Sequence, residues 1–313
     1  MLQRLGELYA LEHNLRDALV TLRQAATLYK NIKGARRITL QMRALFRQFY
    51  LEGKADRLEP IVALGLFNEF RELTPSGDDG DLMIRKLATR LTTVDLLDDA
   101  SALLDHQIKF RLKGAKRATV GARLASLRLS NNKPLDALAA LDASLSEKLS
   151  NDLGERRRLL RAEALMQAKR YDEALKVVEK DFSARFDGMR AQIYWRAGRW
   201  YDAARTFALI TGGFSSNNLK KSEVEILLRR SVALGLAGDT NGIEFLRERF
   251  GRAMEKSHRA TAFKAVAGGA IQSITDFATL ARQAAELDTF RNFLQSAGGA
   301  PATPDRRQTA AAN

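Results

Sequence analysis

Trp195 and Arg196 are adjacent residues of the types that contribute most to binding energy at protein interfaces. They fall in the segment Gly188–Ile210, whose small and apolar residues are spaced as in two packed helices. Trp200 occupies a packing position in that pattern, whereas Trp195 is surplus to it. We therefore expect Trp195 and Arg196 to form an interaction hot spot. The alternative is that Trp195 packs against a neighbouring helical unit.

Basic residues are concentrated in two segments, Lys109–Arg128 and Glu155–Arg161, of a chain with a net charge of +14. Such a surface suits nucleic acid, an anionic membrane face or an acidic protein. The segments lack the interleaved aromatic residues of single-strand binders. An anion-facing edge and an ordinary solvated face both remain open. The predicted basic edge comprises Lys109, Arg111, Lys113, Lys116, Arg117 and Arg123.

Carboxylates and glycines cluster in Ser76–Asp81, but not at the spacing that a calcium loop requires. We interpret Thr74–Asp81 as a flexible loop between helical units. Its carboxylates are also placed to act as a local counterweight to a basic neighbour.

Catalytic and metal-binding chemistry finds little support in this sequence. There is no cysteine, and His13, His106 and His258 share no ligand-like spacing. No phosphate-binding, nucleophile or zinc-protease motif is present. We expect a non-enzymatic protein without metal or cofactor, although a carboxylate pair assembled by the fold stays open.

Small residues recur at one position of a two-helix pattern, which indicates internal repeats. Their spacing is roughly 29 to 42 residues, near the 34 of a helix–turn–helix repeat. A small side chain there lets the two helices cross closely. The position is held by Ala18, Ala100, Ala137, Ala174 and Ala203, and by spacing alone by Leu58 and Ile243.

Seven helical hairpins are expected over residues 1–250, followed by capping helices over 251–297 and a flexible tail over 298–313. Strand patterns are nearly absent, so the predicted fold class is all-α. The predicted hairpins are Leu2–Lys30, Ile38–Leu73, Leu82–Phe110, Ala118–Leu149, Gly154–Phe182, Phe186–Ile210 and Ser222–Phe250.

This pattern resembles the tetratricopeptide repeat superfamily, and its degeneracy resembles divergent bacterial members. The residues that carry the resemblance best are Ala191, Tyr194, Gly198, Trp200, Ala203 and Phe207. The resemblance implies a right-handed α-solenoid of about seven hairpins, whose first helices line a concave groove that binds an extended peptide or a partner helix.

The same resemblance places a set of residues from the fifth, sixth and seventh hairpins on the groove. None of these hairpins shows the Lys-plus-Asn clamp that binds a C-terminal carboxylate in some members. The implied groove residues are Arg156, Glu163, Met166, Arg185, Gln192, Trp195, Arg196 and Arg229.

The sequence therefore predicts a scaffold or adaptor that binds protein, in a setting such as a bacterial motility, secretion or polysaccharide assembly. The alternative is a basic helical-repeat protein that binds nucleic acid or another polyanion. No membrane span is expected. Met1 falls inside the first predicted helix, so we also consider that a signal, an anchor or an enzyme domain precedes it. This leaves the cytoplasm and the periplasm as alternatives.

Overall fold

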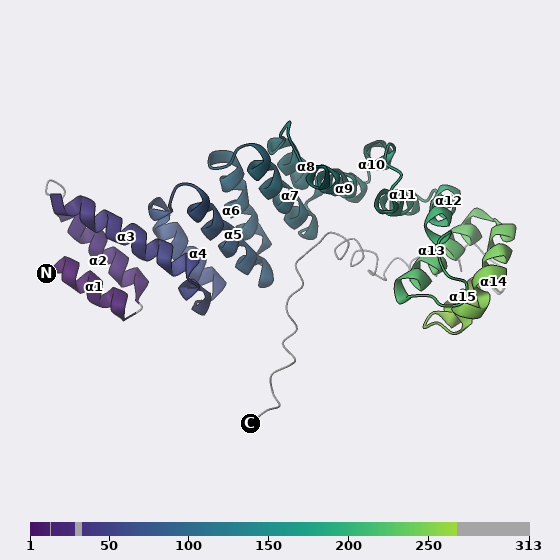
Figure 1. Ribbon diagram of the computed structural model, residues 1–313, viewed down its shortest axis with the longest axis horizontal. Coiled ribbons are helices and arrows are strands. Elements are labelled where there is room, and N and C mark those ends of the chain that lie inside the picture. Colours follow the sequence, from purple (N-terminus) through teal and green to yellow (C-terminus); the bar gives the residue numbers. More distant parts are fainter. Residues whose placement is uncertain (13, 29–32, 268–313) are drawn as a thin grey trace, which may run out of the picture. The chain divides into compact units, whose positions relative to one another are not determined.

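The computed structural model describes residues 1–12, 14–28 and 33–267, and its described part is all-α with fifteen α-helices. The chain divides into two compact units, Met1–Leu153 and Gly154–Asn313, and the division falls near the start of α9 (Asn151–Gln167). Within each unit, helices pack on their neighbours in sequence (Figure 1). This packing is consistent with a helical repeat array.

The first unit contains four successive helical pairs, which match the first four predicted hairpins closely. Its helices are α1 (Leu2–Leu11), α2 (Leu15–Leu28), α3 (Lys33–Leu51), α4 (Pro60–Glu69), α5 (Asp78–Thr93), α6 (Leu97–Phe110), α7 (Gly114–Ser130) and α8 (Pro134–Ala143), with 3-10 turns η1 (Lys54–Arg57) and η2 (Arg71–Leu73).

The second unit continues the same alternation, and its core includes Trp195, Phe207, Leu227 and Phe250. Besides most of α9 it contains α10 (Tyr171–Val178), α11 (Ala184–Arg196), α12 (Trp200–Thr211), α13 (Lys221–Ala237), α14 (Thr240–Glu255) and α15 (Ala260–Ala267).

Small residues at the predicted crossing position are fully buried. Ala18, Ala100, Ala137, Ala174 and Ala203 are each 0% exposed. Helix starts also follow the sequence, since Pro60 and Pro134 lie in the first turns of α4 and α8, where a missing N–H costs nothing. Gly238 ends α13 with φ of 73°, a conformation that favours glycine.

Two boundaries differ from the prediction. The segment Thr74–Asp81 is not all loop, because α5 begins at Asp78 and takes the acidic residues into its first turn. Negative charge is favoured at that end of a helix by the helix dipole. The boundary predicted at residue 250 lies inside α14, and α15 packs on α13 and α14. The remaining cap, 268–297, and the tail, 298–313, lie outside the described residues.

Candidate functional site

Trp195 lies in the core of the second unit and not on an exposed face, which corrects the expectation of an accessible ring. It is 8% exposed, and its ring centroid lies 5.3 Å from that of Trp200 and 6.3 Å from that of Phe207. Ala191, one turn earlier on α11, is also buried, so both residues share the face that packs on α12. Trp200, the predicted core residue, is the less buried of the two tryptophans.

The other predicted groove residues come from α9, α11 and α13 and differ in accessibility. Met166 is buried at 7% exposure, whereas Arg156 and Arg196 are exposed. Arg185 lies 3.9 Å from the carboxylate of Glu155. Three further members are half-buried, namely Glu163, Gln192 and Arg229. Arg156 and Arg196 are therefore the accessible cations of this set.

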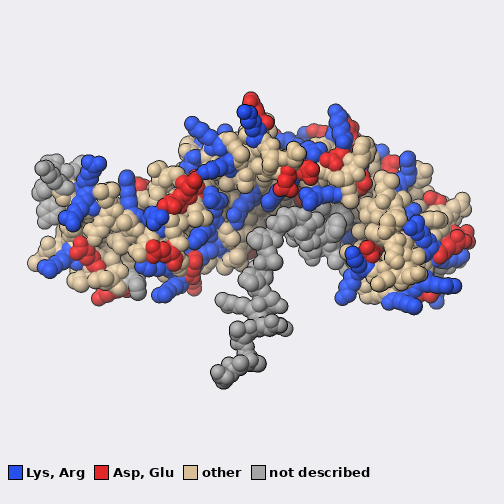
Figure 2. All heavy atoms as spheres, in the orientation of Figure 1, with Lys and Arg blue, Asp and Glu red and all other residues tan. Residues whose placement is uncertain are grey.

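Four of the six residues of the predicted basic edge have a polar partner, which is a carboxylate for three of them and a hydroxyl for the fourth. Lys109 pairs with Asp105 at 2.6 Å and Arg111 with Asp81 at 2.8 Å, while Arg123 donates to the Thr89 hydroxyl. Lys116 also pairs with Asp78. Figure 2 shows Lys and Arg interspersed with Asp and Glu on the visible face. Lys113 is exposed and Arg117 is half-buried.

The acidic residues that begin α5 serve as the predicted counterweight to basic neighbours. Asp78 and Asp81 account for two of the pairs above, and Asp79 pairs with Arg47 of α3 at 2.6 Å. The hydrogen bond from Lys116, with its charge, holds the pKa of Asp78 below its usual value. These residues fix the start of α5 against helices on both sides.

Basic side chains also link the third and fourth helical pairs of the first unit to the pair before each. Lys86 donates to the Leu51 carbonyl, Arg90 to the Leu58 carbonyl, and Lys133 to Asp98, across 35, 32 and 35 residues. These separations equal about one repeat. Part of the basic excess therefore forms contacts between successive helical pairs.

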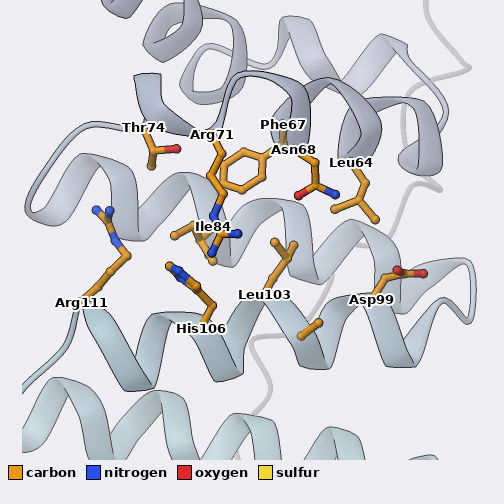
Figure 3. A pocket seen from close by; sticks show the side chains of 11 residues that line it. Leu64, Phe67, Asn68, Arg71, Thr74, Ile84, Asp99, Leu103, His106 and Arg111 are labelled. Atoms are coloured by element: carbon orange, nitrogen blue, oxygen red, sulfur yellow. The ribbon is translucent and has the colours of Figure 1, made fainter.

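A pocket of about 220 Å³ lies in the first unit between α4 and α6, over α5 (Figure 3). Leu64, Phe67, Asn68 and Arg71 line one side, and Asp99, Ala102, Leu103 and His106 line the other. Each residue of the first set precedes its counterpart by 35 residues, so the two sides are equivalent faces of consecutive repeats. Helices α4 and α6 make at most sparse contact with each other.

One end of the pocket carries Arg71, His106 and Arg111, and the other carries Asp99 (Figure 3). Arg111 is held in place, because it donates to Asp81 at 2.8 Å and to the Pro75 carbonyl at 2.6 Å. Arg71 is exposed and forms no ion pair within the described part of the chain. The Thr74 hydroxyl oxygen is buried without a hydrogen-bond partner among the described residues.

His106 is biased toward its neutral form. Burial lowers its pKa, and the positive charges of Arg71 and Arg111 lower it further. Its ring centroid lies 4.8 Å from that of Phe110. Of the pocket residues, the sequence analysis had singled out only Arg111 and, as one of the scattered histidines, His106. The pocket residues of segments 64–71 and 99–106 follow the same helical spacing (i, i+3, i+4, i+7), and both sets include polar residues. Sequence reasoning missed this similarity.

No family model matches this chain, and no curated protein matches it significantly. Within the described residues, no helix is both long enough and apolar enough to cross a membrane. The same residues contain no group of three His, Asp or Glu side chains placed to hold a metal ion.

Proposed function

We propose that this chain is a non-enzymatic adaptor that recognises a segment of another protein through its helical pairs. The observation that carries the proposal is the pocket between α4 and α6, which combines apolar side chains with several polar and charged groups. In ligand pockets, apolar walls supply buried surface and polar groups fix orientation and specificity. The sequence resemblance to tetratricopeptide repeats supports the same conclusion, and from it alone we propose a solenoid in a bacterial envelope assembly.

The surroundings of His106 favour binding over catalysis at this pocket. An acid–base histidine is usually oriented by a hydrogen bond to a carboxylate or carbonyl. Within the described residues, the ring of His106 contacts Phe110 instead. The pairing of Lys109, Arg111 and Lys116 with carboxylates likewise makes a polyanion the less favoured partner.

Site-specific photo-crosslinking tests the proposal. A benzophenone amino acid replaces Asn68, which is exposed at the pocket, and in a control it replaces Leu135 of α8, which is 62% exposed outside the pocket. After irradiation in extract from the source cells, we expect a discrete protein adduct from position 68 only. The identified protein, made recombinantly, should bind the unmodified chain. Identical adducts from both positions, or no protein adduct at 68, would reject a partner site here.

A further inference from the structure

We propose that the pocket between α4 and α6 binds an apolar side chain of the partner together with a neighbouring acidic side chain, whose carboxylate pairs with Arg71. This inference names the chemistry of the partner and rests on the proposed adaptor function. The site differs from the groove expected of the superfamily, because it is formed mainly by the second helices of two hairpins, α4 and α6.

The apolar half of the proposal follows from the floor and walls of the pocket. Phe67 and Ile84 are each 3% exposed and Leu64 is 6% exposed, with Leu103 facing them from α6. A volume of about 220 Å³ is below that of a typical small-molecule site but accommodates one large side chain. A side chain that fills it would contact α4 and α6 at once and gain dispersion contacts with both.

The acidic half follows from the balance of charge at one end of the pocket. Of the two arginines at this end, Arg111 is already neutralised by Asp81, whereas Arg71 has no counterion within the described residues. In Figure 3 the Arg71 side chain extends between α4 and α6 toward His106. A partner carboxylate at this end would supply the counterion that Arg71 lacks.

Asp99 at the opposite end disfavours a purely anionic ligand such as a phosphate backbone, because its carboxylate would repel a second negative charge of that ligand. Ile61 and Val62, 50% and 51% exposed, add apolar surface near the start of α4. A segment that continues past the pocket suits this surface, which favours an internal acidic side chain over a chain terminus.

The test uses the full chain and a blocked peptide, acetyl-Ala-Leu-Phe-Glu-Ala-amide, with its Gln twin and inorganic phosphate as comparison ligands. Binding is followed by the NMR signal of the His106 ring. We expect the Glu peptide to shift this signal with about fivefold tighter binding than the Gln twin, as for a partly exposed ion pair. Arg71→Gln should abolish the preference, while Arg57→Gln, at an exposed arginine outside the pocket, should preserve it.

Equal binding of the two peptides to the unmodified protein would overturn the assignment of Arg71. A shift of the His106 signal by phosphate as large as that by the peptide would reduce the site to a simple anion site and reject the apolar anchor. The two proposals fail separately. If the protein does not distinguish the two peptides but position 68 still gives a protein adduct, only the proposed partner chemistry is rejected. If the protein prefers the Glu peptide but position 68 gives no protein adduct, the adaptor function is rejected.

Discussion

Replacing Gly80 by alanine should destabilise the first unit, although alanine is the better helix former. Gly80 is buried in the first turn of α5. A Cβ atom there would overlap the Pro75 carbonyl oxygen and come within 2.5 Å of Nη2 of Arg111. Those two groups form a 2.6 Å hydrogen bond with each other, so the added methyl group displaces the link that closes this end of the pocket.

The magnitude follows from three contributions to the free energy of unfolding. Overpacking costs about 1–3 kcal/mol, and loss of a hydrogen bond from a charged donor costs about 1.5–3 kcal/mol. The gain in helix propensity offsets about 1 kcal/mol. A net loss of about 1.5–5 kcal/mol should lower the melting temperature of a unit of this size by about 3–20 °C.

Gly65→Ala is the matched control. Gly65 lies in the neighbouring helix α4, is exposed, and a Cβ atom would meet nothing within 4 Å. The Gly65→Ala substitution should raise the free energy of unfolding by about 0.5–1 kcal/mol. Thermal and urea unfolding by circular dichroism measure both variants. Tryptophan emission reports the second unit separately, because both tryptophans, Trp195 and Trp200, lie there. A Gly80→Ala protein as stable as Gly65→Ala would refute the packing argument.

Two further predictions concern the core of the second unit and the pocket histidine. Trp195→Ala should cost about 3–5 kcal/mol in urea unfolding, and Trp200→Ala less, because Trp195 is the more deeply buried ring; equal losses would contradict the assigned burial. Since the folded pKa of His106 is depressed, its contribution to stability is present above its ordinary pKa of 6.5 and is lost as the pH falls through the folded value. His106→Gln should therefore flatten the decline in urea midpoint below pH 6.5, and an unchanged slope would assign that decline to other groups.

The helical pairs could be predicted from the sequence because their causes are local. A small residue such as Ala100 or Ala203 at each crossing, and a proline such as Pro60 at a helix start, act within one hairpin. The predicted hairpins accordingly agree with the observed helices. The acidic start of α5 was placed in a loop, because its stabilising partners, Arg111 and Lys116, come from later helices.

Side-chain roles were harder to predict, as the two tryptophans illustrate. A repeat pattern describes the contacts inside one hairpin, and by that measure Trp195 is surplus. A helix inside an array is covered by neighbours on more than one side, and α11 packs on both α10 and α12. The ring of Trp195 nevertheless contacts those of Trp200 and Phe207 in α12, the second helix of its own hairpin, so Trp195 is part of the packing inside that hairpin and not surplus to it.

Apart from the start of α5, the secondary structure, the pairing of helices and the likeness of successive hairpins follow from residue spacing and short-range packing, which can be read in the sequence. The tertiary structure decided which charges are paired and where a pocket opens. Asp78 and Lys116 form a pair only because α5 and α7 lie within reach of each other. The pocket lies where residues of α4, α5 and α6 come together, an arrangement that depends on how these helices pack.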